Sequence, residues 1–274
     1  MRIKKGERPV VFLPGAGLVG LDYYNLHERL ETGSVIYDRA GTGWGAPATL
    51  PRSAADVVGE LRSLLAAEGV AGPYVLAGHS LGAFYARRYA QLHPGEVAGL
   101  LLLDPGHEDI FDFMPEGAAE LNERMKPDLA QLPELTGEQV AAARKGWGEA
   151  LAPLPEDVRE QLVDYHVTRW RVAVEETLNF ESEVYGELRA GGPLPDVPLM
   201  VLTAKGRNPY WAQFMTEEQM KQAHDGIHAM HAAMVASVSR GEHRELDGAS
   251  HQFMHLEHED AVLAAIRDLV GALP

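Results

Sequence analysis

Short runs of apolar residues, bounded by Gly, Pro or Asp, recur along the 274-residue chain at 9–13, 34–37, 74–77, 100–103 and 198–203. The runs do not alternate with polar residues, which indicates strands that are covered on both faces. Segments 54–67, 81–92 and 260–270 carry apolar residues at three- and four-residue spacing, which predicts amphipathic helices. Because strands and helices alternate, the sequence predicts an α/β fold, a mostly parallel sheet with helices on both faces.

Residues 107–192 interrupt this alternation, because they contain several helix signals and no convincing strand. Thr136 and Gln139 have the spacing of a capping box, and Pro155 precedes a second helical pattern. We interpret this segment as a helical cap inserted into a core domain formed by 1–106 and 193–274. The alternative interpretation is a set of ordinary surface helices.

The charge of the chain limits its partners. It has 24 Lys and Arg against 40 Asp and Glu, a net charge of −16, and no cysteine. An acidic protein without a basic run is a poor ligand for nucleic acid or an anionic membrane, and disulfides and thiolate chemistry are excluded. No apolar run reaches the roughly 18 residues that span a bilayer, and the amino terminus lacks a signal-peptide pattern. We therefore expect a cytoplasmic protein without a nucleic-acid or membrane partner.

Ser80 lies in the sequence Gly78-His-Ser-Leu-Gly82, between the predicted strand 74–77 and the predicted helix 81–92. A serine at a strand-to-helix turn is exposed at the sheet edge, with helix N–H groups beside its oxygen. The flanking positions must be glycine, since a Cβ would collide with the neighbouring strand and helix. The pattern predicts that Ser80 is a nucleophile at the elbow formed by Gly78 and Gly82.

A nucleophilic serine needs a base, and this architecture places the base last in the chain. His251 follows a glycine-bearing loop after a short run at 243–247 and precedes the terminal helix, so it is the candidate base. His255, four residues later, is its competitor. The other histidines are expected to be solvated or packing residues.

The third group should be a carboxylate that orients the histidine. The loop after the strand 198–203 is a usual position for it, but residues 204–211 contain no acid. Asp104 follows the strand 100–103, and its carboxylate can approach the same imidazole. We favour Asp104 and keep three alternatives: Glu108, Asp109 and Asp225.

A metal site is a further hypothesis. His224, His228 and His231 follow one another at i, i+4 and i+7 on one face of a helix predicted over 216–239, a spacing compatible with Zn or Ni. The i+7 partner lies two turns away, which is far for one ion. We therefore expect no functional metal.

Several segments together resemble the α/β-hydrolase fold superfamily, in particular its bacterial esterase-like members. The matching segments are 13–17 (LPGAG), 37–44 (YDRAGTGW), 72–82 (GPYVLAGHSLG), 103–105 (LDP) and the segment around His251. The resemblance implies an oxyanion hole formed by the N–H groups of Ala16 and Leu81. The chain departs from the family in two ways. Pro14 stands where the family usually has histidine, and only eight residues precede the 9–13 strand, too few for the antiparallel strands that usually begin this fold. The first antiparallel strands should thus be absent or vestigial, leaving about six strands.

The sequence predicts a serine hydrolase, a monomer or homodimer without a cofactor, that cleaves carboxylic esters of a small neutral molecule. Ser80, His251 and Asp104 would act through an acyl-enzyme. The same residues would serve a lactonase, an amidase or a perhydrolase, and a non-catalytic ligand-binding protein on this scaffold is the rival of a different class. One or two aromatic residues should line the pocket, and the candidates are Phe111, Phe113, Trp147, Tyr165, Trp170, Phe180, Tyr185, Tyr210 and Trp211.

Overall fold

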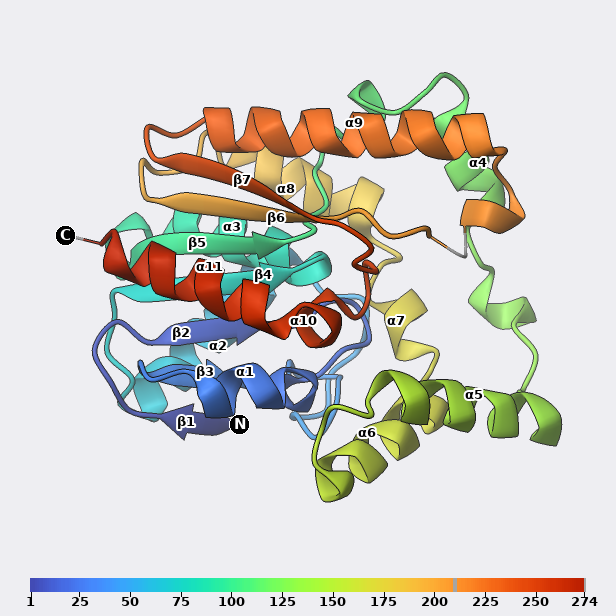
Figure 1. Cartoon of the computed structure of the whole chain (residues 1–274), viewed down its shortest axis with the longest axis horizontal. Helices are drawn as coiled ribbons and strands as arrows, with labels where there is room; N and C mark the ends of the chain where they lie inside the picture. Colours follow the sequence, from blue (N-terminus) through green and yellow to red (C-terminus); the bar gives the residue numbers. More distant parts are fainter. Residues whose placement is uncertain (209–210, 274) are drawn as a thin grey trace.

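The computed structural model describes residues 1–208 and 211–273, which form a seven-stranded sheet between two layers of helices (Figure 1). The strand order is β1-β3-β2-β4-β5-β6-β7. Only the β1–β3 pair is antiparallel among these strands. The strands are β1 (Arg2–Lys4), β2 (Val10–Leu13), β3 (Ser34–Ile36), β4 (Tyr74–His79), β5 (Val97–Leu103), β6 (Leu199–Ala204) and β7 (Gly241–Leu246).

Helices form the remaining regular structure. The α-helices are α1 (Tyr24–Arg29), α2 (Ala54–Ala67), α3 (Leu81–Leu92), α4 (Ala118–Met125), α5 (Gly137–Ala150), α6 (Glu156–Thr168), α7 (Val172–Glu175), α8 (Tyr185–Ala190), α9 (Glu217–Ala236), α10 (Met254–Glu257) and α11 (Glu259–Gly271). Short 3₁₀ turns are η1 (Gly20–Tyr23), η2 (Pro94–Glu96), η3 (Ile110–Asp112), η4 (Leu129–Gln131) and η6 (Trp211–Gln213), and η5 (Phe180–Val184) is a π-helical turn.

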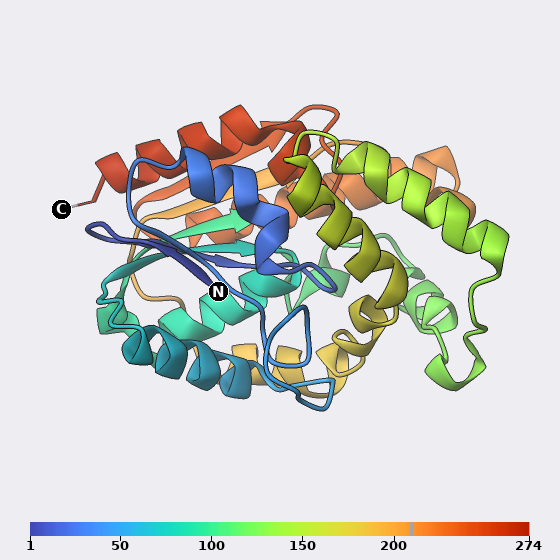
Figure 2. The same cartoon turned by 90° about the horizontal axis from the view of Figure 1, so that it is seen from below.

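Successive residues of each central strand enter different cores. In β2, Val11 and Leu13 pack with α2 and α3, whereas Val10 and Phe12 pack with α1 and α11 on the opposite face. Figure 2 shows α1 and α11 on one side of the sheet and α2 and α3 on the other. Side chains alternate between the two faces of a strand, and the core on each face is apolar. The strand therefore appears in the sequence as a continuous apolar run.

The predicted α/β class is confirmed, including the mostly parallel sheet with helices on both faces. The sheet has seven strands, one more than the approximate number expected from the sequence. The additional strand is β1, three residues that pair antiparallel with β3 at the sheet edge. Its residues are exposed or half-buried, so it lacks the apolar run by which β2 to β6 were found.

Between β5 and β6, the described chain contains helices and turns without a strand. The Thr136 capping box is present, and α6 begins after Pro155 as the sequence predicts. Helices α5 and α6 share an apolar cluster with the core that includes Val19 and Leu256. Figure 1 shows α5 and α6 beyond the end of the sheet at which β2, β4 and β5 terminate. We refer to residues 107–192 as the helical segment.

No helix in the described ranges is both long enough and apolar enough to cross a membrane. Of the aromatic candidates named from the sequence, Tyr210 lies outside the described residues.

Candidate active site

The turn from β4 to α3 places Ser80 at the carboxyl edge of the sheet. Ser80 has φ 49° and ψ −114°, in the left-handed region that L-residues rarely adopt. A Cβ at Gly82 would lie 1.9 Å from the Leu13 carbonyl oxygen, and a Cβ at Gly78 would lie 2.6 Å from the Gly82 oxygen. Both positions therefore require glycine, because strand β2 and the start of α3 approach the turn too closely for a side chain.

Ser80, His251 and Asp104 form one hydrogen-bonded array, although they come from three separate loops. The Ser80 Oγ lies 2.9 Å from His251 Nε2, and His251 Nδ1 lies 2.6 Å from Asp104 Oδ2. A carboxylate oxygen only accepts, so Nδ1 carries the ring proton and Nε2 is free to accept from the serine hydroxyl. This tautomer is the one that general-base catalysis requires.

Asp104 is held from several sides at the end of β5. It has a positive φ of 41°, and its Oδ1 accepts a hydrogen bond from the Ala204 N–H at 3.1 Å. Next to it, the Pro105 carbonyl lies 2.9 Å from His231 Nε2 on α9. The carboxylate thus has both oxygens occupied and its backbone anchored, which fixes the direction in which it faces His251.

The electrostatics of the pair favour an ionised acid beside a basic histidine. Burial opposes the charge on Asp104, but the hydrogen bond and charge of His251 hold the pKa of Asp104 below its usual value. Loss of solvation likewise opposes a charge on His251, yet the Asp104 carboxylate raises the pKa of His251 above its usual value. Asp104 therefore makes His251 a stronger proton acceptor than a free histidine.

The alternative residues named from the sequence have other partners. His255 is buried and stacks on Tyr23 with ring centroids 4.6 Å apart. Glu108 pairs with Arg87, Asp109 pairs with Arg189, and Asp225 pairs with Lys221. Of the six acids and bases considered as partners of Ser80, only His251 and Asp104 belong to its hydrogen-bonded array among the described residues.

His79 joins the His251 loop to the loop after β2, a link that sequence reasoning missed. Its Nε2 lies 2.7 Å from the His251 carbonyl, its Nδ1 lies 2.8 Å from the Tyr23 hydroxyl, and that hydroxyl accepts from the Gly15 N–H at 3.3 Å. A carbonyl only accepts, so His79 donates through Nε2 and accepts from Tyr23 through Nδ1. Burial lowers the pKa of His79 to about 3, which keeps the ring in this neutral form.

The two N–H groups named for an oxyanion hole lie in segments that flank Ser80. Leu81 is the first residue of α3, so its N–H has no partner within the helix. Ala16 lies in the loop after β2, which Gly82 touches closely at Leu13 and Pro14. Among the backbone hydrogen bonds of residues 1–208 and 211–273, none uses the Ala16 N–H. Neither N–H is therefore bonded to a backbone carbonyl among the described residues.

A cavity of about 740 Å³ opens on Ser80, His251 and Asp104. One part of its lining is a cluster of three rings, in which the Phe84 centroid lies 5.4 Å from that of Phe180 and 5.5 Å from that of Tyr185. Further lining residues are Trp211, Ile227, Met230, Phe253 and Arg207. Three of the aromatic candidates, Phe180, Tyr185 and Trp211, thus line the cavity, and its lining is mainly apolar.

The three helical histidines do not converge on one point. His228 Nδ1 lies 2.6 Å from Glu245, whereas His231 bonds to Thr203 and to the Pro105 carbonyl. His224 lies beside the Trp211 ring, with centroids 6.0 Å apart. Across the described ranges, no group of three or more His, Cys, Asp or Glu residues is arranged to hold a metal ion.

A strand-turn-helix serine, an adjacent histidine and an acid at the end of the next strand define the site of an α/β-hydrolase-type protein. Comparison with known families agrees with this class. The chain belongs to the alpha/beta hydrolase family, whose model matches residues 10–265. That range includes Ser80, Asp104 and His251.

Individual relatives are more distant. The uncharacterized protein YqjL of Bacillus subtilis is 40% identical over 88 residues, which are 31% of this chain and 35% of YqjL. An uncharacterized protein of Schizosaccharomyces pombe is 37% identical over 76 residues, 28% of this chain and 14% of that protein. The matches thus span about a third or less of these curated relatives.

Two solved structures share the fold over most of their length. A hydrolase from Pseudomonas aeruginosa superposes with a TM-score of 0.62 at 17% identity, covering 99% of this chain and 93% of that one. A thermophilic esterase from Thermogutta terrifontis gives a TM-score of 0.58 at 18% identity, covering 98% and 91%. At such identities the likeness establishes the α/β-hydrolase fold alone.

Proposed function

We propose that this protein is a serine hydrolase that cleaves carboxylic esters through Ser80, His251 and Asp104. The observation that carries the proposal is the hydrogen-bonded array of these three side chains at the floor of an apolar cavity. Nucleophile and base lie 2.9 Å apart, and the acid holds the base in the required tautomer.

The reaction proceeds in two acyl transfers. Ser80 Oγ attacks the ester carbonyl carbon while His251 Nε2 takes the hydroxyl proton, and the N–H groups of Ala16 and Leu81 bind the oxyanion. The carbonyl re-forms, the C–O bond to the alcohol breaks, and the alcohol leaves with the proton from His251. Water then attacks the acyl-enzyme by the same route and releases the acid. Asp104 stabilises the imidazolium in both halves.

The lining of the cavity indicates an uncharged ester with an apolar acyl or alcohol group. Phe84 comes from the core, whereas Phe180 and Tyr185 come from the helical segment. We therefore also propose that residues 107–192 act as a cap on a core of 1–106 and 193–274, because this segment supplies part of the substrate cavity. The cavity volume of about 740 Å³ is within the range of sites that enclose small molecules.

The direct test is hydrolysis of p-nitrophenyl esters of graded acyl length, together with labelling by a fluorophosphonate. We expect stoichiometric labelling and turnover, with kcat/KM rising about fourfold for each added methylene that the cavity buries, since one buried CH₂ contributes about 0.8 kcal/mol. Esters matched in length but ending in a carboxylate should react more slowly.

Other outcomes separate the rivals. Labelling without turnover of any ester would redirect the proposal to lactones, amides or peracid formation on the same residues. Neither labelling nor turnover would contradict the proposed function and favour a non-catalytic ligand-binding protein, which a ligand that raises the melting temperature without being consumed would support.

The pH dependence of kcat/KM tests the role of His251. A protonated His251 cannot accept the serine proton, so activity is expected to be lost as pH falls through the pKa of His251. Because Asp104 raises this pKa, the half-maximal rate should lie above pH ~6.5, the ordinary value for histidine. His79, with a pKa of about 3, stays neutral throughout and adds no second step. A half-maximal rate at or below pH ~6.5 in the wild type would contradict the assignment.

A further inference from the structure

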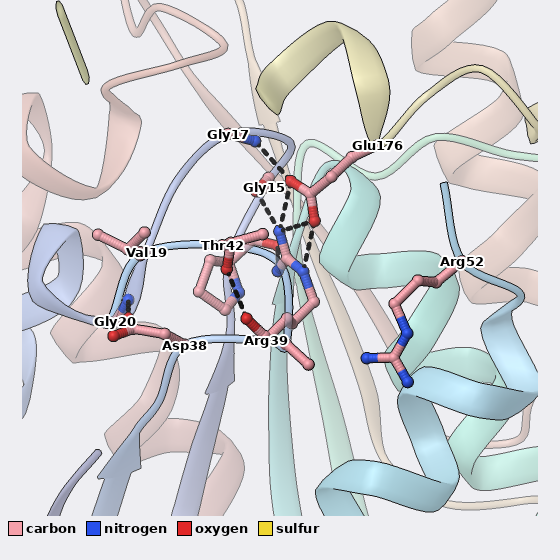
Figure 3. Close-up of polar contacts among 12 residues, drawn as sticks. Gly15, Gly17, Val19, Gly20, Asp38, Arg39, Thr42, Arg52 and Glu176 are labelled. Carbon is pink, nitrogen blue, oxygen red and sulfur yellow. Dashed lines mark hydrogen bonds and ion pairs between the residues drawn. The ribbon is translucent and has the colours of Figure 1, made fainter. Parts of the chain in front are cut away.

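The loop after β2 is held in place at almost every backbone polar group around Ala16. Arg39 donates from one terminal nitrogen to the Pro14 carbonyl at 2.6 Å and from the other to the Gly15 carbonyl at 2.9 Å. The Gly17 N–H donates to Glu176 Oε2 at 2.8 Å. Figure 3 shows the Arg39 guanidinium between Gly15 and Glu176. The Ala16 N–H therefore lies between two peptide groups whose orientations are fixed by side chains.

Arg39 and Glu176 form a buried ion pair that reaches this loop from two different parts of the chain. Arg39 follows β3, and Glu176 caps the carboxyl end of α7 in the helical segment. The Arg39 Nε and one terminal nitrogen donate to the two Glu176 oxygens at 2.8 and 2.9 Å, and the two side chains are only 1% and 3% exposed. Burial of such a pair is costly unless its remaining hydrogen-bonding groups are also used. Here the backbone of the loop uses them.

The geometry of one peptide bond links Arg39 to the oxyanion donor. The Gly15 carbonyl and the Ala16 N–H belong to the same planar trans peptide, so they point in opposite directions. When Arg39 holds the Gly15 oxygen, it fixes the direction of the Ala16 N–H on the other side of the loop. A cation on the oxygen also polarises the amide and strengthens its N–H as a donor.

The helical segment touches the same loop by packing. A Cβ built on Gly17 would lie 2.6 Å from the Ala173 Cβ of α7, and Gly17 has a φ of +71°. The loop and α7 are thus in direct contact beside the Glu176 carboxylate. Displacement of α7 would remove the partner of a buried arginine as well as the partner of the Gly17 N–H.

We propose that Arg39 and Glu176 are positioning residues for the oxyanion hole, which set the Ala16 N–H only while α7 is docked on the core. The proposal rests on the proposed function, since an oxyanion hole matters only if Ser80 attacks a carbonyl. Arg39 acts through the Gly15–Ala16 peptide and does not itself touch the substrate. It follows that the α7 end of the helical segment stays docked during the chemical step.

The test uses Arg39→Lys and, because a buried charge change can impair folding, the double variant Arg39→Met with Glu176→Leu. Lysine keeps the charge but lacks the planar fork that holds two carbonyls and a carboxylate together, and the apolar pair removes both buried charges. In variants that retain the wild-type circular dichroism, kcat should fall by about 10- to 100-fold with KM changed by less than about threefold.

Binding of ketones separates positioning from general damage to the site. Ser80 adds to a trifluoromethyl ketone, its proton passes to His251, and the ketone oxygen becomes an oxyanion. We expect the variants to lose affinity for this ketone by the same factor as kcat/KM, about 10- to 100-fold, while binding the matching unreactive methyl ketone as the wild type does.

The matched control is an Arg–Glu pair outside the site. Arg62 and Glu96 form a similar forked pair on the surface, and Arg62→Lys should leave both ketone affinities and kcat unchanged. Suppose that the wild type is active but the Arg39 variants keep the wild-type kcat, or lose affinity for both ketones by the same factor. Either result would overturn the positioning role alone. A wild type that neither labels with fluorophosphonate nor hydrolyses esters would overturn the proposed function, and this inference with it.

Discussion

Ser80→Ala is expected to lower kcat for p-nitrophenyl esters by on the order of 10³-fold or more and to abolish fluorophosphonate labelling. The reason is that the variant removes the only atom that bonds to the acyl group, while the oxyanion donors and the cavity remain. Alanine keeps a Cβ at the same backbone position, so the strained turn at φ 49° is no worse than in the wild type and the melting temperature should change little.

The measurement is steady-state hydrolysis with thermal unfolding of the same preparations. Ser63→Ala is the matched control, because Ser63 lies on the exposed face of α2 and its hydroxyl bonds only to the Gly59 carbonyl among the bonds described for it. Ser63→Ala should label and turn over as the wild type does. A Ser80→Ala enzyme that keeps its rate would show that another group is the nucleophile.

Asp104→Asn is expected to lower kcat by about 10⁴-fold while leaving the fold intact. The Ala204 N–H requires an acceptor at Oδ1, so the asparagine amide nitrogen would face His251. A donor at that position favours the tautomer in which Nδ1 accepts and Nε2 carries the proton. His251 would then be unable to take the serine proton.

The pH profile of the same variant gives an independent check. Without the carboxylate, the pKa of His251 should fall, and the acid limb of the remaining activity should move to lower pH than in the wild type. Asp109→Asn and Asp225→Asn are matched controls, because these acids pair with Arg189 and Lys221. If one of them, and not Asp104→Asn, caused the loss of rate, the acid would have to be reassigned.

The strands and helices of the core could be predicted because each carries a local signal. The run 74–77 and the helix 81–92 correspond to β4 and α3, and α3 has the predicted bounds. The edge strand β1 was not predicted, since Arg2–Lys4 has no apolar run and is too short for alternation to be recognised. Only its antiparallel pairing with β3 defines it as a strand.

The residues of the candidate site likewise fall into those that carry a local sequence signal and those that do not. Ser80 and His251 could be named because chain order and flanking glycines mark them, and Asp104 because it follows an apolar strand. Tyr23, His79 and Glu176 carried no signal. Their contacts join residues separated by 56, 172 and 159 positions, and a single sequence does not record which distant side chains meet.

The segment 37–44 shows both sides of this division. In the sequence it was only a motif in keeping with a family resemblance. In the structure, Asp38 accepts from the N–H groups of Gly20 and Trp44, and Arg39 reaches the loop after β2 and Glu176. Through these hydrogen bonds, Asp38 and Arg39 hold the backbone on both sides of the Ala16 loop in place (Figure 3).

The sequence by itself determined the α/β class, the position of the strand-to-helix turn at Ser80 and the residues proposed as base and acid, because these depend on local periodicity and on backbone conformations that only certain residues adopt. Only the tertiary structure decided which acid faces His251, how His79 is protonated, and that an arginine and a glutamate 137 residues apart hold the loop of Ala16. These depend on distances and burial, and both arise only when the chain has packed.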